Sequence, residues 1–295
     1  MKKIKTIVFP VGGFGTRFLP ATKATPKEML PVAEKPLIQY AFEEAMDAGI
    51  EKFIFITGRN KNSIEDHFDH SFELQTVLDE KKKIEMLEKT IGWLPPAGHI
   101  IFLRQQKPIG LGHAVLCAER FVGNEPFVVS LADEMCYGKD KNFLRQMIES
   151  HSGKKVNILG ITEVEKKDVS KYGVVDPGEE VGDLVKIKNM VEKPRVEEAP
   201  SNLCSMGKYI LQPEIFEYLK ETKIGSGGEI QLTDAMKLMM ESHDFYGLKF
   251  KEERFDCGSV LGYLEANIFY ALKDEKIAEG VKKIINKFHG RISGE

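Results

Sequence analysis

Residues 5–17 read KTIVFPVGGFGTR, an apolar run followed directly by a loop with three glycines and an arginine. The apolar run has the composition of a buried strand. The stretch that follows it is too rich in glycine, proline and threonine to form a helix. In an α/β sheet the loop after the first strand lies at the carboxyl edge, where such folds bind ligands. The stretch therefore predicts both a fold class and the place of a binding site.

The first half of the chain alternates short apolar runs with helical patterns. Besides the opening strand, three strands are predicted, at residues 52–57 (KFIFIT), 99–104 (HIIFLR) and 126–132 (PFVVSLA). A helix is predicted at 36–49, between the first two strands. This rhythm is typical of a Rossmann-like α/β fold, with a mixed, mainly parallel sheet flanked by helices on both faces.

The pattern changes after about residue 150. Strands joined by short turns are predicted at 155–161, 172–177, 184–194 and 204–211, and a helix at 228–242. The tail from Val260 onward is mostly helical, with Leu261, Leu264, Ile268 and Leu272 on one face. We expect a single domain over 1–295. It comprises a first part (roughly 1–150), an inserted antiparallel part (151–258) and a C-terminal helical segment (259–295).

One segment, 71–98, is longer than a simple connection between strands requires, and its first part reads as a charged amphipathic helix. We expect an insertion there that covers one side of the site.

Composition narrows the class of ligand. The net charge is −3, which gives no support for a nucleic-acid partner, and no apolar run is long enough to cross a membrane. The four cysteines form no CxxC pair, so a zinc site is not expected and a reducing, cytoplasmic location fits best. A few local cations must therefore hold any anionic ligand.

The glycine-rich loop supplies such a place. Gly12, Gly13 and Gly15 allow a close backbone approach to phosphate oxygens, and Arg17 and Lys27 bring cations. The spacing matches neither the dinucleotide fingerprint nor the P-loop. From the residues alone, a glycine turn with a surface arginine explains the stretch equally well.

The wider sequence favours the binding loop. Residues 12–31, GGFGTRFLPATKATPKEMLP, resemble the signature of sugar-nucleotide pyrophosphorylases, and further blocks follow in the family's order: RQQKPIGLGHAV, YGVVDP, VEKP, GGEIQLTDA and FDCGSVLGY. The resemblance implies the nucleotide-diphospho-sugar transferase fold and a reaction of a nucleoside triphosphate with a hexose 1-phosphate. The blocks SFELQ and GLGHAV favour UTP and glucose 1-phosphate as substrates, with UDP-glucose and diphosphate as products. A sister enzyme that uses dTTP or another hexose 1-phosphate, and a non-catalytic nucleotide-sugar sensor, are the alternatives.

The resemblance also implies roles for particular residues. The residues expected to bind the triphosphate are Gly12, Gly13, Gly15, Thr16, Arg17 and Lys27. Gln105 and Gly110 are expected to recognise uracil, with Gln106 as an alternative to Gln105. On the sugar side, the residues expected to bind the sugar phosphate are Gly173, Glu192 and Lys193. Arg17, Lys27, Asp133 and Lys193 are the expected catalytic groups. Gly207 and Lys208 are further candidates for the sugar side, and His113 is assigned no catalytic role because an anionic nucleophile needs no base.

Asp133 and Asp256 are the implied ligands of Mg²⁺. Asp133 follows the strand at 126–132, so its carboxylate is expected at the carboxyl edge of the sheet, although a turn or helix-cap aspartate is the alternative. Two letters depart from the family. Gly12 stands where the family usually has alanine. Asp133 is followed by Glu134 in the segment SLADE, which differs from the family's usual sequence, so the identity of any second carboxylate at this place stays open. The resemblance finally implies a homodimer or homotetramer.

Overall fold

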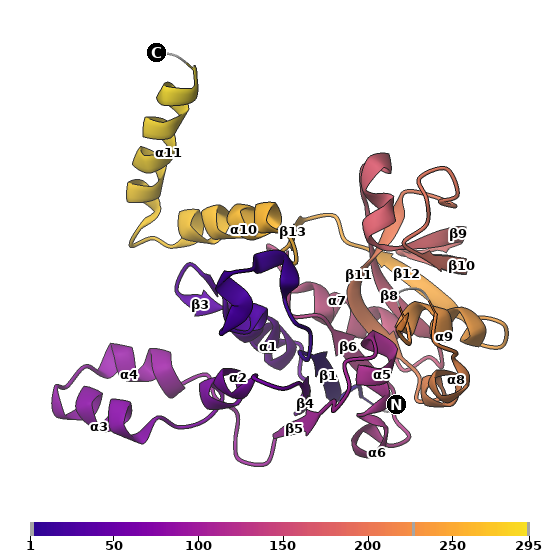
Figure 1. Cartoon of the computed structure of the whole chain (residues 1–295), viewed down its shortest axis with the longest axis horizontal. Helices are drawn as coiled ribbons and strands as arrows, with labels where there is room; N and C mark the ends of the chain where they lie inside the picture. The colour runs from indigo at the N-terminus through magenta and orange to yellow at the C-terminus, as the bar shows by residue number, and fades with distance from the viewer. Residues whose placement is uncertain (1–2, 226–227, 294–295) are drawn as a thin grey trace.

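The computed structural model describes residues 3–225 and 228–293. A nine-stranded sheet runs through it in the order β5-β4-β1-β6-β11-β8-β12-β10-β9 (Figure 1). The first four are β5 Ile100–Arg104, β4 Lys52–Thr57, β1 Thr6–Pro10 and β6 Phe127–Ser130, all parallel. The other five are β11 Leu203–Leu211, β8 Asn157–Glu163, β12 Phe245–Lys249, β10 Leu184–Glu192 and β9 Gly173–Val181.

The predicted α/β class is confirmed. Pairing in the second half is antiparallel except between β8 and β12. Because β11 pairs directly with β6, the antiparallel part continues the same sheet rather than forming a separate one.

Successive side chains of the central strands enter two different cores. Phe53 and Phe55 of β4 pack into one core, and Ile54 and Ile56 into the other, because neighbouring strand residues point to opposite faces. The first face is covered by α1 Leu37–Asp47, α2 Asn62–His67 and α7 Phe143–His151, and the second by α5 Leu111–Leu116, α6 Glu119–Val122, α8 Ile215–Glu221 and α9 Leu232–Met239. Because the helices cover the two faces of the sheet, the carboxyl edge of β1 and β6 is lined by loops.

A small second sheet lies beside that edge. Strand β7 Glu134–Tyr137 pairs antiparallel with β13 Glu253–Asp256, which places Asp256 opposite Glu134. A third apolar cluster, which includes Met135 and Phe255, packs this pair against α10 Val260–Lys273 and the short strand β2 Pro31–Val32, which pairs with β3 Lys35–Pro36. Segments far apart in the sequence thus meet where β6 ends.

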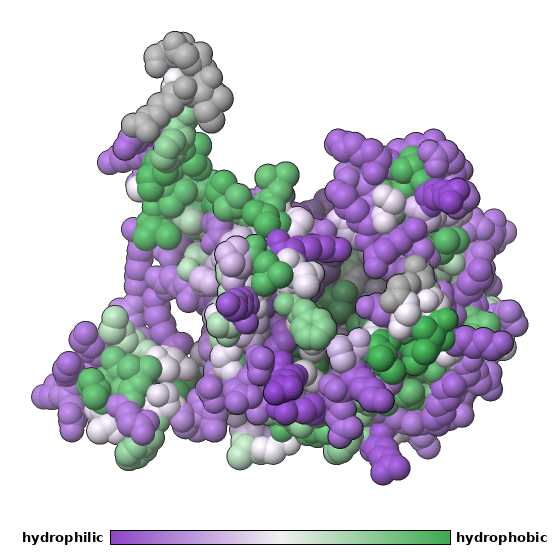
Figure 2. Space-filling view, in the orientation of Figure 1, coloured by the Kyte–Doolittle hydropathy of each residue, from purple (hydrophilic) through white to green (hydrophobic). Residues whose placement is uncertain are grey.

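Two helical segments project from the body (Figure 1). They are the hairpin of α3 Phe72–Glu80 and α4 Ile84–Ile91, and the terminal helix α11 Ala278–Ser293. The hairpin points away from the sheet, so the prediction that segment 71–98 covers the site is wrong. An ion pair of 2.5 Å joins Glu85 Oε1 of α4 to Nζ of Lys276, which lies in the turn before α11. Figure 2 shows apolar side chains over both segments.

The helix predicted at 228–242 starts later than expected. Helix α9 begins at Leu232, because its N-cap residue Gln231 is extended and the backbone of Ile230 is already hydrogen-bonded to another segment. Its N–H donates to Ile109 O and its carbonyl accepts from Gly112 N, both at 2.8 Å. Gly227 of the GGEIQLTDA block lies outside the described residues. Within the described part of the chain, no helix has the length and apolar character needed to cross a membrane.

Candidate active site

The glycine-rich loop leaves the end of β1 and folds into three short 3₁₀ turns, Thr16–Phe18, Ala21–Lys23 and Lys27–Met29. Gly15 adopts a left-handed conformation with φ of 65°, and its carbonyl accepts a 2.7 Å hydrogen bond from the Thr22 hydroxyl. A Cβ on Gly15 would lie 3.1 Å from Cβ of Lys27. Glycine at this position therefore lets the loop close onto Lys27. Gly13 and Thr16 lie exposed on the same loop.

Lys27 and Asp133 face each other at the end of β6. Lys27 Nζ lies 2.5 Å from Asp133 Oδ2, and both side chains are largely buried. Burial alone would raise the pKa of Asp133, but the charge and hydrogen bond of Lys27 outweigh it and hold that pKa below its ordinary value. Burial likewise opposes the charge of Lys27, yet Asp133 and Glu28 keep its pKa above the ordinary value. Both groups are therefore charged at neutral pH.

Asp133, Asp256 and Arg17 converge around Gly258. A Cβ built on Gly258 would lie 2.9 Å from Asp256 Oδ1, 3.0 Å from Asp133 Oδ2 and 3.4 Å from Arg17 Nη1. The backbones are tied as well, because Cys257 N donates to Asp133 O at 2.8 Å. The two aspartates predicted from distant parts of the sequence thus face one small space, next to the predicted phosphate-binding arginine.

This donor set fits a hard divalent cation. Mg²⁺ commonly takes one or two protein carboxylates and completes its shell with water and substrate phosphates. The space that a Cβ on Gly258 would fill is bordered by one oxygen from each aspartate. Among residues 3–225 and 228–293 no group of three or more His, Cys, Asp and Glu side chains could hold a metal. The protein ligands of a cation here would be the two aspartates, and water or phosphate would complete its shell.

Glu134 is turned to a different partner. Its two carboxylate oxygens accept from Arg254 Nη2 at 2.9 Å and Arg254 Nε at 3.0 Å. Burial raises the pKa of Glu134 to about 8, although Arg254 opposes the shift. Since both of its oxygens are engaged, Glu134 is an anchor for Arg254 in this structure and not a third carboxylate of the aspartate pair.

Gln105, the predicted base reader, is buried next to the glycine loop. Its backbone N–H donates to Thr57 O at 2.8 Å, and its side-chain Nε2 donates to Gly110 O at 3.1 Å. Nε2 also lies 2.9 Å from His113 Nδ1. Burial lowers the pKa of His113, so the imidazole is neutral and can accept this bond. The amide is thereby held with its Oε1 toward the loop, where a Cβ on Gly12 would lie 3.2 Å away.

An alanine at position 12, as is usual in the family, would therefore press on the Gln105 oxygen, which would have to shift by a few tenths of an ångström. At Gly110, by contrast, glycine is required. Its φ is 113°, and a Cβ would lie 2.5 Å from Ile230 O. The glycine allows the loop before α5 to pack on the segment before α9.

The predicted sugar-side residues meet across β9 and β10. Gly173 is directly opposite Glu192 in the antiparallel register, and a Cβ on Gly173 would lie 3.2 Å from Glu192 Oε2. Glu192 Oε2 accepts from Thr233 Oγ1 at 2.6 Å. Lys193 adopts a left-handed conformation with φ of 45°, which turns the chain after β10, and its Nζ lies 3.3 Å from Glu192 Oε1. The chain therefore bends directly after Glu192, and this bend leaves the Lys193 side chain half exposed.

Lys208, a further candidate for the sugar side, is not part of this group. It is completely buried and pairs with Glu44 at 2.5 Å beneath the sheet. The bulge at Ser205–Tyr209 in β11 turns it into the core, so its role is in packing.

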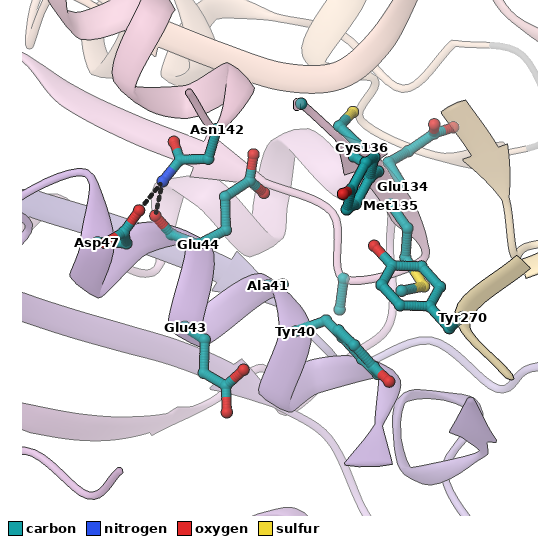
Figure 3. A pocket seen from close by; sticks show the side chains of 13 residues that line it. Tyr40, Ala41, Glu43, Glu44, Asp47, Glu134, Met135, Cys136, Asn142 and Tyr270 are labelled. Atoms are coloured by element: carbon teal, nitrogen blue, oxygen red, sulfur yellow. Dashed lines mark hydrogen bonds between the residues drawn. The ribbon is translucent and has the colours of Figure 1, made fainter. Parts of the chain in front are cut away.

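A cavity of about 270 Å³ lies between α1, β7 and α10 (Figure 3). Four carboxylates line it, and each has a partner: Glu43 with Lys35, Glu44 with Lys208, Asp47 with Asn142, and Glu134 with Arg254. Acidic walls disfavour phosphate groups. The cations that could attract them lie instead at the glycine loop.

Three residues near the site were not singled out from the sequence. Tyr172 donates its hydroxyl to Asp256 Oδ2 at 2.7 Å, Thr233 holds Glu192, and Lys61 forms a buried 2.8 Å ion pair with Glu28 beside Lys27. Tyr172 and Thr233 do lie inside blocks that carried the family resemblance, which was the available signal. Nothing in the sequence pairs Lys61 with Glu28.

A glycine-rich loop after β1, an aspartate pair at the same edge and a polar strand pair are the arrangement expected of a nucleotidyltransferase. The chain belongs to the nucleotidyl transferase family, whose model matches residues 6–273. Over 287 residues it is 45% identical to the UTP–glucose-1-phosphate uridylyltransferase of Staphylococcus epidermidis, covering 97% of this chain and 99% of the relative. The Bacillus subtilis enzyme of the same name is 44% identical, covering 95% of both chains.

Solved structures agree with this family. A UDP-glucose pyrophosphorylase complexed with UDP-glucose has a TM-score of 0.82 and 46% identity, covering 92% of this chain and 100% of its own. The UTP-bound UDP-glucose pyrophosphorylase of Acinetobacter baumannii has a TM-score of 0.88 and 40% identity, covering 96% and 98%.

Proposed function

We propose that this protein is a uridylyltransferase that converts UTP and α-D-glucose 1-phosphate into UDP-glucose and diphosphate. Relatives that are 44–45% identical over nearly the whole chain bear that activity in their names, and similar structures hold UTP or UDP-glucose. The structural observation that carries the proposal is the convergence of Asp133, Asp256 and Arg17 on one small space, with Lys27 bonded to Asp133. A cationic and metal-competent site of this kind suits a triphosphate.

The chemistry needs little from the protein beyond position and charge. The sugar phosphate oxygen attacks the α-phosphorus of UTP in line, and diphosphate leaves on the opposite side. The nucleophile is already an anion, so a general base is not required. The obstacle is repulsion between two anionic substrates, and the cationic side chains reduce it.

Each charged side chain has an assignment in this proposal. Arg17 and Lys27 bind the departing diphosphate, and Lys193 binds the phosphate of the sugar substrate. When bound by Asp133 and Asp256, Mg²⁺ supplies charge neutralisation at the α-phosphate. Lys27 must then exchange Asp133 for a phosphate oxygen, and its position on the rim of the same space makes that exchange a short movement.

Gln105 is proposed to read the base. Its amide is fixed by Gly110 and His113, so Oε1 faces the glycine loop and can accept the N3–H of uracil. Cytosine presents an acceptor at that position and is disfavoured. On this basis residues 1–150 form the nucleotide-binding part, 151–258 the sugar-binding part and 259–295 a terminal helical segment.

A diphosphate-release assay tests the proposal. Glucose 1-phosphate is incubated with UTP, dTTP, CTP or ATP in turn, with Mg²⁺ or with EDTA. We expect turnover with UTP that EDTA abolishes. Preference for dTTP would identify the sister activity. UDP-glucose binding without turnover would identify a sensor.

The same proposal includes a homodimer or homotetramer in the cytoplasm, as the resemblance and the cysteine spacing favour. Its structural support is the apolar surface of the C-terminal helices, where Leu261, Leu264, Ile268, Ile284 and Phe288 are about half exposed or more. Light scattering of the full chain and of a Leu261→Glu/Ile268→Glu variant tests it. We expect the variant to be smaller.

A further inference from the structure

The placement of Asp256 is set by a chain of side chains that the proposed reaction does not itself use. Asp256 ends β13, a strand of four residues outside the main sheet, so the nine-stranded ladder does not fix it. Its Oδ1 accepts from Gly258 N at 3.0 Å, and its Oδ2 accepts from the Tyr172 hydroxyl at 2.7 Å. The tyrosine is thus the side chain that orients this carboxylate.

Tyr172 is held in turn by an arginine on the same strand as Asp256. The guanidinium carbon of Arg254 lies 5.0 Å from the centroid of the Tyr172 ring. Arg254 and Asp256 are alternate residues of β13 and therefore point to the same side of the strand. The cation–π contact and the hydroxyl bond hold the tyrosine at two places, ring and tip.

Glu134 completes the chain of contacts. It binds Arg254 through two hydrogen bonds. The side chain of Arg254 is only 14% exposed and that of Glu134 only 9%. A bidentate pair that water barely reaches is directional, so it fixes the guanidinium plane. Glu134 also lies opposite Asp256 in the β7–β13 register and directly follows Asp133.

The backbone of Tyr172 reaches the other half of the site. Its carbonyl accepts from Lys193 N at 3.0 Å, and the next residue, Gly173, pairs with Glu192. One residue therefore contacts a carboxylate of the metal-competent pair through its side chain and the sugar-side turn through its backbone.

We propose that Tyr172 is a positioning residue that aims Asp256 into the site and couples its position to the sugar-side turn, with Arg254 and Glu134 as its support. This inference rests on the proposed function for the roles of the two halves. It also assigns Glu134 a role as the anchor of this support rather than a metal ligand.

The first test compares Tyr172→Phe with the parent. The phenylalanine keeps the aromatic ring beside Arg254 and removes the hydroxyl, with its bond to Asp256 and its interaction with Arg254. Removal of a group that orients a metal ligand typically weakens metal binding ~10-fold or more. We expect binding of Mn²⁺ alone, measured by electron paramagnetic resonance, to weaken by about 10-fold.

Tyr218→Phe is the matched control. Tyr218 lies on α8, away from the site, and this substitution likewise removes one hydroxyl contact, the 2.6 Å bond between Tyr218 and Ser242. Its Mn²⁺ affinity should equal that of the parent. Equal Mn²⁺ affinity in Tyr172→Phe and the parent, or no Mn²⁺ binding by the parent, overturns the inference.

A second variant separates positioning from mere stability. Arg254→Lys keeps the positive charge but loses the bidentate pair with Glu134 and the guanidinium that contacts the Tyr172 ring. We expect it to reproduce the Mn²⁺ defect, to raise KM for glucose 1-phosphate more than KM for UTP, and to add little in combination with Tyr172→Phe. A lower melting temperature with unchanged Mn²⁺ affinity and KM values marks a structural role and overturns the proposal. Failure of the parent to transfer uridylyl groups refutes the proposed function but leaves the Mn²⁺ comparison valid.

Discussion

Lys27 Nζ lies 2.5 Å from Oδ2 of Asp133, so two groups with separate predicted duties are bonded to each other. The pair keeps both side chains charged although each is largely buried. It also means that binding of a cation and a triphosphate replaces one interaction of Lys27 with another. The site is therefore arranged around an exchange of partners.

The first prediction concerns the aspartates. Asp133→Asn or Asp256→Asn removes a carboxylate from the space beside Gly258 and should lower turnover by at least about 100-fold at saturating Mg²⁺. Diphosphate release measures the loss, and circular dichroism checks the fold. Near-parental rates in either variant would contradict the metal assignment.

The second concerns Lys193, whose half-exposed ammonium lies beside Glu192 after the turn in β10. Loss of a charge-assisted bond to the sugar phosphate typically costs about 1.5–3 kcal/mol, so Lys193→Ala should raise KM for glucose 1-phosphate by roughly 10-fold or more and leave KM for UTP nearly unchanged. Lys188→Ala removes an exposed lysine of the same strand and is the control. Identical kinetics in Lys193→Ala and the parent refute the role.

The third concerns the base. Gln105→Ala removes the amide held by Gly110 and His113 and should reduce the preference for UTP over CTP by about 10-fold. Competition assays with both triphosphates measure the preference. Gln106→Ala changes an exposed neighbour and should have no effect. The reverse result would move the base reader to Gln106.

The fourth concerns the buried pair beneath Lys27. Lys61 and Glu28 are 6% and 1% exposed, so Lys61→Met leaves an uncompensated carboxylate and should lower the free energy of unfolding by about 3–5 kcal/mol in urea. Burial already raises the pKa of Glu28 despite Lys61. A raised folded-state pKa means that stability falls as pH rises, so the loss should be smaller in acid. Lys61→Met/Glu28→Gln should recover part of it. A loss independent of pH would contradict the explanation.

The fifth concerns Gly110. Both Gly110→Ala and Gly123→Ala place an alanine at positive φ, but only the first brings a Cβ within 2.5 Å of a backbone oxygen. In thermal or urea unfolding, Gly110→Ala should lower the free energy of unfolding by about 1–3 kcal/mol more than Gly123→Ala does. Equal losses would show that the contact with Ile230 relaxes freely.

The sequence alone determined the local structure and the class of fold. The unbroken apolar run that includes Phe53 and Ile54 predicted a strand, and it is buried on both faces because side-chain direction has a period of two. The glycine loop and Asp133 at the end of its strand were predicted for equally local reasons. The domain limits and the residue roles stay predictions for the experiments above.

Only the tertiary structure decided which residues meet. Pairing of β11 with β6, and of β7 with β13, depends on packing between distant segments, and so does the start of α9, where contacts of Ile230 override local helix propensity. The bonds of Lys27 with Asp133, Lys61 with Glu28 and Tyr172 with Asp256 have the same origin. A pattern specifies where a side chain points along its own element. The partner it finds depends on how the elements bury their apolar faces together.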